Sequence, residues 1–294
     1  MGYAFLALAL FAGVTKGYCG KKTGGYVHGV GGSVMANIIR MVLCALIGLV
    51  IVLAGGSASG LLPSGTVMAI SLFSGVSTAV FVVSWLISVE RSAYMMLDVF
   101  LMLGVLVPIL AESLLFGESV ALTQWLGIGI LLVAVVLMCS YNNSIKKKLT
   151  LSALSLLTLC GLSNGLADLS QKLFVRYSGG TPASVFNLYT YVFAGLTLVI
   201  AYPFLKGKKD GGGIEWRRVA VYIAIMAACL FANSYFKTLA AAHLSAVLLY
   251  PLNQGAALIL SSLMSATLFR ERLTVKAIAG IITAFIGLLI INLL

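Results

Sequence analysis

The chain has 294 residues, of which 61% are hydrophobic and only 9% are Asp, Glu, Lys or Arg. Soluble domains carry about 25% charged residues, so this composition excludes a soluble globular domain, and it equally excludes a disordered chain. Five scattered cysteines in so long a chain exclude a small disulfide-stabilised domain. The net charge of +11 is concentrated between apolar stretches, which favours contact with anionic lipid and argues against a nucleic-acid partner. The remaining class is a polytopic membrane protein.

Ten apolar stretches follow one another along the chain. The length of each is similar to the about 20 residues that a helix needs to cross a bilayer. The first is expected to be a retained span and not a signal peptide, because it lacks a basic start and its lysines follow the apolar run. We therefore predict an all-α integral membrane fold with spans at 2–18, 33–53, 65–89, 93–115, 123–141, 150–174, 183–205, 217–241, 244–268 and 274–293.

The second half of the sequence repeats the first. Residues 116–120 (FGESV) match residues 269–273 (FRERL) 153 positions later, and Gly127 and Gly280 stand at the same offset. Each half contains five predicted spans, an odd number, so the two halves must cross the membrane in opposite directions. We expect residues 1–145 and 146–294 to form two inverted five-helix repeats of one integrated transmembrane domain, which is a common plan for secondary transporters.

These repeated blocks carry a resemblance to a known family. Residues 85–137 resemble the EamA-type module of the drug/metabolite transporter superfamily, with its GE loop at 116–118 (FGE) and its glycine-punctuated helix from 124–127 (QWLG). Residues 244–294 match the module as well, although Asp98 stands where this second copy has Pro251. The resemblance implies a ten-helix secondary transporter. The small multidrug resistance relatives have a glutamate midway along their first span, where this chain has Gly13 and Asn164, so their cation site cannot be transferred to it.

Two patterns that carry chemistry elsewhere are better explained by packing. Residues 161–165 (GLSNG) match the G-x-S-x-G of hydrolases, but that motif requires a strand-to-helix turn, and this copy lies inside an apolar span. The glycine pairs Gly13/Gly17 and Gly161/Gly165 are expected to let helices approach closely. The cysteines lack metal-ligand spacing. We therefore predict no enzymatic activity, no metal and no cofactor.

Seven ionisable residues fall inside predicted spans, where inserting each costs about 2.5–3.5 kcal/mol and requires a partner, water or a function. Glu112 and Lys172 are expected to snorkel toward span ends. Alternatively, Lys172 pairs with Asp168, which lies four residues earlier on the same helix face. Arg40 shares a face with Asn37, and we expect the two to form a structural polar patch.

The other buried ions form two predicted acid–base pairs. By residue count, Lys16 and Asp98 each lie about 9 Å along their helix from a connection on one side of the membrane. Asp168 and Lys237 lie on the opposite side of the midplane. We hypothesise that these pairs act as alternating gates or as substrate contacts beside each gate.

Polar and aromatic side chains are expected between the two pairs. Tyr250, Asn253 and Gln254 share one helix face, and an amide patch that faced lipid would be costly. The alternative for Trp85 is a lipid-facing or interfacial position. We predict a cavity between the halves, lined by spans one, three, four, six, eight and nine, with spans five and ten at the periphery. The candidate residues for substrate binding or gating are Lys16, Trp85, Asp98, Asn164, Asp168, Asn233, Lys237, Tyr250, Asn253 and Gln254.

The predicted function is secondary active transport. The sequence has no G-x-x-x-x-G-K-[ST] loop, so the energy must come from an ion gradient or from exchange. We expect a small polar metabolite, zwitterionic or anionic and amino-acid-like, to move by alternating access, with a proton or sodium ion as the coupling ion. The alternative is an organic-cation or drug exporter in which Asp98 is the counter-ion and aromatic rings supply cation–π contacts. A receptor or scaffold that does not transport would have a solid core between the halves, and a membrane enzyme would need a nucleophile or metal ligands.

The orientation follows from the distribution of basic residues. Odd-numbered connections between spans carry 14 Lys and Arg residues, and even-numbered ones carry at most two, Lys172 and Arg176. Because basic connections stay in the cytoplasm, we expect both termini outside the plasma (inner) membrane. Members of the resembled family are often drawn with both termini inside, so the charge count and the resemblance disagree on this point.

Overall fold

The computed structural model describes residues 1–55, 61–90, 94–139, 151–205, 213–268 and 275–293. Within these ranges all regular secondary structure is helical, apart from one isolated bridge between Val27 and Ile214. The helices are α1 (Gly2–Thr23), α2 (Gly29–Ala54), α3 (Gly65–Glu90), α4 (Tyr94–Gly104), α5 (Leu106–Phe116), α6 (Leu122–Cys139), α8 (Leu151–Tyr177), α9 (Ala183–Leu205), α10 (Trp216–Ala241), α11 (Ala246–Leu268) and α12 (Val275–Leu293).

The surface is apolar where a soluble protein would be polar. Large hydrophobic side chains such as Phe11, Phe204 and Val221 are exposed, whereas Arg40, Asp168 and Lys237 are buried. Among the described residues, seven helices are long and apolar enough to cross a membrane, and shorter apolar helices lie at 100–116, 122–134 and 278–291. The predicted all-α integral membrane class is confirmed, while ten spans in an exact inverted repeat stay a prediction.

The predicted span at 93–115 is interrupted. Pro108 has no N–H to donate to the carbonyl of Gly104, and α4 ends at that glycine. Val105 bridges the break with a hydrogen bond from its N–H to Met102 O (3.2 Å), after which α5 continues to Phe116. Gly117 then ends α5 in the left-handed conformation (φ +70°), which favours glycine.

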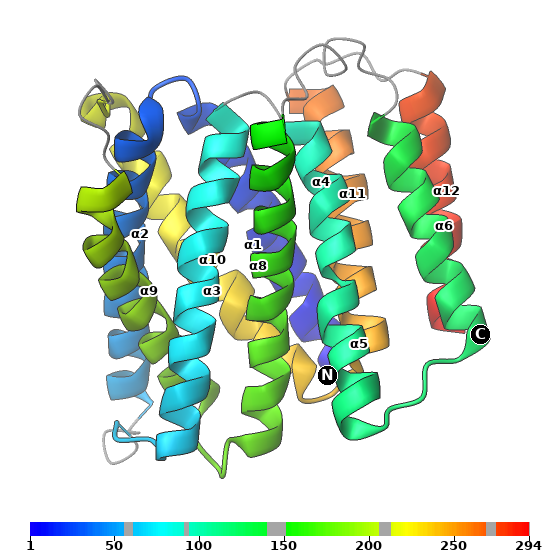
Figure 1. Ribbon diagram of the computed structural model, residues 1–294, viewed down its shortest axis with the longest axis horizontal. Coiled ribbons are helices and arrows are strands. Elements are labelled where there is room, and N and C mark those ends of the chain that lie inside the picture. The colour runs from blue at the N-terminus through cyan, green and yellow to red at the C-terminus, as the bar shows by residue number, and fades with distance from the viewer. Residues whose placement is uncertain (56–60, 91–93, 140–150, 206–212, 269–274, 294) are drawn as a thin grey trace.

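Helices from the two halves of the chain alternate in space. The principal neighbours are α1 with α10, α3 with α8, α2 with α9 and α6 with α12. If each of the first five spans is exchanged for its counterpart in the last five, the α1–α10 pair becomes the α3–α8 pair, and the α2–α9 and α6–α12 pairs are unchanged. This is the contact pattern that two inverted repeats would produce. Both termini lie at the same end of the molecule, and α6 and α12 form its edge (Figure 1).

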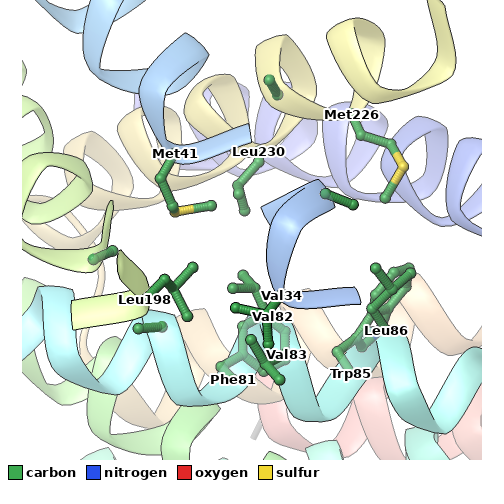
Figure 2. Close-up of a cluster of buried hydrophobic side chains, with 14 of the residues drawn as sticks. Val34, Met41, Phe81, Val82, Val83, Trp85, Leu86, Leu198, Met226 and Leu230 are labelled. Carbon is green, nitrogen blue, oxygen red and sulfur yellow. The ribbon is translucent and has the colours of Figure 1, made fainter. Parts of the chain in front are cut away.

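The main hydrophobic core lies between seven helices, α1, α2, α3, α4, α8, α9 and α10. Figure 2 shows part of it, with Val34 and Met41 of α2 facing Phe81 and Val82 of α3 and Leu230 of α10. Trp85 belongs to this core and is only 5% exposed, so its predicted alternative position facing lipid or the interface is wrong. The core holds α3 and α10 in place around the polar centre of the molecule.

Candidate substrate-binding cavity

A cavity of about 90 Å³ lies between the two halves of the chain, which is enough for several water molecules or part of a small ligand. Residues of α1, α3, α4, α8, α10 and α11 line it. These helices correspond to spans one, three, four, six, eight and nine, so the predicted lining is confirmed. The peripheral position predicted for spans five and ten agrees with the edge position of α6 and α12 (Figure 1).

Seven of the ten predicted site residues line this cavity. The structure brings them together from α1, α3, α8, α10 and α11. Of the other three, Asp168 and Tyr250 are buried directly behind the wall, and the side chain of Asp98 lies outside the described residues. The seven lining residues are Lys16, Trp85, Asn164, Asn233, Lys237, Asn253 and Gln254.

Lys16 of α1 meets aromatic rings in the cavity wall. Its Nζ lies 5.5 Å from the ring centroid of Phe81 and 5.8 Å from that of Trp85, within the range of cation–π contact. Gly20, one turn further along α1, allows the Trp85 ring to approach, because a Cβ at that position would lie 2.3 Å from the ring. Lys16 makes no ion pair with the side chains that the structure describes, and its predicted pair with Asp98 stays a prediction.

Lys237 of α10 pairs with Asp168 of α8, as the sequence predicted. Nζ of Lys237 donates to Oδ1 of Asp168, and the two residues are 6% and 1% exposed. Tyr250 of α11 donates its hydroxyl to the backbone oxygen of Asp168 at 2.6 Å, so α8, α10 and α11 are joined at one point. The second carboxylate oxygen of Asp168 has no hydrogen-bond partner.

The amides in the cavity wall are partly unpaired. Asn233 donates from Nδ2 to the backbone oxygen of Ala9 at 2.7 Å, which ties α10 to α1. Asn164 Nδ2 and Asn253 Oδ1 are buried without a hydrogen-bond partner. A buried polar atom left unpaired costs about 1–3 kcal/mol, so these two atoms are available to a polar ligand. The cavity therefore offers an ammonium, a donor, an acceptor and aromatic surface.

The predicted snorkelling of Glu112 and Lys172 is wrong, and so is the alternative pairing of Lys172 with Asp168. Lys172 Nζ lies 3.5 Å from Glu112 Oε1 and donates to Leu244 O at 2.7 Å. Glu112 Oε2 accepts the backbone N–H of Ala246 at 3.2 Å. Glu112 and Lys172 are 5% and 9% exposed, and the backbone of Leu244 and Ala246, just before and at the start of α11, binds them. Asp168 and Lys172 each find a partner on a neighbouring helix instead of along α8.

The predicted polar patch on α2 is confirmed. Arg40 is buried, and its Nη1 donates to Asn37 Oδ1 at 2.6 Å. Asn37 in turn donates to the backbone oxygens of Ser33 and Val82, which links α2 to α3. Arg40 does not line the cavity.

The two predicted glycine pairs have different roles. A Cβ on Gly161 would lie 2.1 Å from Phe100 O, and one on Gly165 would lie 2.2 Å from Gly104 O, so this pair brings α8 against the end of α4. Gly13 and Gly17 instead line the cavity, with Gly13 facing the side chain of Asn233. Only Gly161 and Gly165 serve close helix packing of the predicted kind.

Sequence analysis missed a chain of uncharged polar contacts beside the Asp168–Lys237 pair. Gln171 Nε2 donates to Ser234 Oγ (3.4 Å), Ser234 donates to Asn187 Oδ1 (2.7 Å), and Asn187 Nδ2 donates to Thr238 Oγ1 (3.4 Å). These residues lie on α8, α9 and α10. Their amides lie inside predicted spans, and the cost of burying an unpaired amide was the signal in the sequence that could have indicated them.

The chain is similar to known proteins in its fold and in the sequence of its second half. No curated protein matches it. A solved structure described only as "Crystal structure of protein" superposes with a TM-score of 0.75 at 15% identity, covering 99% of this chain and 96% of the other, which shows a shared fold. Residues 151–293 match the model of the EamA-like transporter family. By this match the second half of the chain is a module of the EamA-like transporter family, which is a family of membrane transporters in the drug/metabolite transporter superfamily.

Proposed function

We propose that the chain is a secondary active transporter that moves a small zwitterionic or anionic metabolite, such as an amino acid, by alternating access. The observation that carries this proposal is the charge of the cavity wall. Two ammonium groups line it, Lys16 and Lys237, and Asp168 pairs with the second of them. One positive charge therefore remains among the described groups around the cavity, and a substrate carboxylate would balance it.

The unpaired amides support recognition of a zwitterion. In this proposal, the substrate carboxylate lies against Lys16 and accepts from Asn164 Nδ2, and the substrate ammonium donates to Asn253 Oδ1. Both amide atoms are buried and without a partner in the cavity wall. Hydrogen bonds that involve a charged group contribute about 1.5–3 kcal/mol each. Two or three such contacts provide the moderate affinity that a transporter needs to release its substrate.

The ion pairs support alternating access. Lys237 lies four residues, about 6 Å along the helix axis, from the end of α10. Lys16 lies seven residues, about 10 Å, from the end of α1, which is at the opposite end of the molecule. The Asp168–Lys237 pair and the Tyr250 hydroxyl join α8, α10 and α11 beside the cavity. We infer that this pair is one gate and that Lys16 with Asp98 is its counterpart at the other end. A proton or sodium gradient would drive the cycle.

An organic-cation exporter is the second candidate, because Phe81 and Trp85 present aromatic surface to the cavity. Lys16 already occupies the position over these rings that an organic cation would take. Such a substrate would have to displace a resident ammonium and then rely on Asp98. The zwitterion or anion is therefore the first proposal.

The proposed orientation in the plasma (inner) membrane places both termini outside, on the strength of the basic odd-numbered connections. Labelling single cysteines with an impermeant thiol reagent on intact cells tests it, after the native cysteines are removed. A cysteine at Ser57 should react and one at Ser144 should not. The reverse pattern would place both termini inside.

Binding to the purified protein tests the substrate class. Radiolabelled L-amino acids and tetraphenylphosphonium are measured against wild type, Lys16→Gln and Asp98→Asn. We expect amino acids to bind, and binding to weaken at least tenfold in Lys16→Gln. Tetraphenylphosphonium binding that Asp98→Asn abolishes would establish the organic-cation alternative.

A further inference from the structure

Two buried oxygen atoms on one face of α8 have no hydrogen-bond donor. They are Asp168 Oδ2 and Gln171 Oε1, in side chains that are 1% and 4% exposed. The residues are three apart in one helix, so their side chains are neighbours on its surface. Because an unpaired buried acceptor costs about 1–3 kcal/mol, a group that donates to these oxygens would be strongly favoured here.

The remaining atoms of both side chains are already engaged. Lys237 donates to Asp168 Oδ1, and Gln171 Nε2 donates to Ser234, which is itself bound to Asn187. These contacts fix the two side chains with their free oxygens on the same face of α8. The site is therefore built from three helices and has unused acceptors only.

The charged groups around Asp168 restrict what can bind. Lys237 of α10 is in contact with it, and the charge of Lys16 on α1 also acts on it. Tyr250 of α11 donates to its backbone, and Lys172 one turn along α8 is neutralised by Glu112 of α5. The one charged residue of α3 is Glu90 at its end, and the side chains of Glu90 and of Asp98 on α4 are outside the part that the structure describes. A metal cation beside this carboxylate would be repelled by two ammonium groups.

We propose that Asp168 is the coupling-proton site of this transporter, and that a proton on its Oδ2 releases Lys237 to join Lys16 in binding the carboxylate of the substrate. The proton comes from the aqueous phase through the cavity and forms an O–H bond, which can then donate to Gln171 Oε1. The same step breaks the ion pair with Lys237. One proton thereby satisfies both unpaired acceptors.

The charge of the site is conserved in this exchange. Before it, a carboxylate and an ammonium are paired; after it, a neutral carboxylic acid stands beside an ammonium paired with the substrate carboxylate. Proton and carboxylate each bind more tightly when the other is present, because linkage is reciprocal. The inference rests on the proposed transport of a carboxylate-bearing substrate, and it makes that transport a proton symport.

Infrared spectroscopy of the purified full chain in lipid tests the proton site without any substrate. Difference spectra between mildly alkaline and mildly acidic buffer are recorded for wild type, Asp168→Asn, Asp168→Glu and Glu112→Gln. We expect acidification to produce a protonated-carboxyl band in wild type. Asp168→Asn should lose it, Asp168→Glu should shift it, and Glu112→Gln should keep it.

Each other result overturns the inference. A band that survives unshifted in Asp168→Asn or Asp168→Glu belongs to another carboxyl. A carboxylate that responds to sodium at fixed pH and not to acid identifies a sodium site. Should Asp168→Asn fail to purify as a folded protein, Asp168→Glu alone decides. An Asp168 band in a protein that binds none of the radiolabelled amino acids would leave the proton site standing and refute the proposed function instead.

Discussion

Two buried ion pairs occur in the described part of the chain, both anchored on α8, and they differ in how completely they are satisfied. Glu112 and Lys172 contact each other and the backbone of Leu244 and Ala246, neither has an unpaired buried side-chain atom, and neither lines the cavity. In the other pair, Lys237 lines the cavity and one oxygen of Asp168 is unpaired. Burial and pairing alone therefore do not identify a functional ion pair; an unsatisfied group beside a cavity does. We regard the Glu112–Lys172 pair as structural and the Asp168–Lys237 pair as functional.

The largest expected effect comes from disrupting the structural Glu112–Lys172 pair. Glu112→Ala leaves Lys172 buried with no counter-ion, so unfolding in detergent should require about 3–5 kcal/mol less. The double variant Glu112→Gln/Lys172→Met should lose much less, since it leaves no uncompensated charge. Equal losses in the two variants would show that packing, and not charge, dominates at this position.

A second test displaces the helix that carries both pairs. Gly104→Ala would place a Cβ 2.1 Å from Gly161 O, so α4 and α8 must separate, at a cost of about 1–3 kcal/mol or more. Gly129→Ala is the matched control, because no atom lies within 4 Å of a Cβ there. Thermal unfolding should show a clear drop for the first variant and none for the second. Similar unfolding temperatures would contradict the close α4–α8 contact.

The third test compares the two lysines of the cavity. Lys16→Gln removes the ammonium that lacks a described counter-ion, and the loss of a charged hydrogen bond of about 1.5–3 kcal/mol should raise KM for amino-acid uptake about tenfold or more. Lys22→Gln, near the end of the same helix, should leave uptake unchanged. An unchanged KM in Lys16→Gln would remove this residue from the site.

The smallest expected effect concerns an uncharged side chain. Asn253→Ala removes the acceptor proposed for the substrate ammonium, and at the lower end of the about 1.5–3 kcal/mol of such a bond KM should rise about tenfold. Ser163→Ala, whose hydroxyl bonds to its own helix, is the control. A complete loss of uptake in Asn253→Ala alone would assign this asparagine a larger role than the lysines.

Much of this arrangement could be predicted from the sequence, because the cost of burying polar groups in lipid restricts where they can lie. That argument placed Asn233, Asn253 and Gln254 in the cavity wall and paired Asp168 with Lys237. It failed for Glu112 and Lys172, since distance from a span end cannot show that α5 and the turn before α11 cover them. The interruption at Gly104 also escaped prediction, although Pro108 signalled it. Which partner a buried ion chooses depends on helix rotation, and apolar periodicity in a membrane fixes this rotation poorly.

The central claim is that the Asp168–Lys237 pair works in transport and does not merely hold helices together. Uptake of a radiolabelled amino acid into proteoliposomes by Asp168→Asn/Lys237→Met tests it, with Glu112→Gln/Lys172→Met as the matched control. Both double variants remove a pair without leaving a buried charge, so both should fold. We predict that the first loses transport and the second keeps it. Wild-type uptake by Asp168→Asn/Lys237→Met would show that this pair, too, has only a structural role.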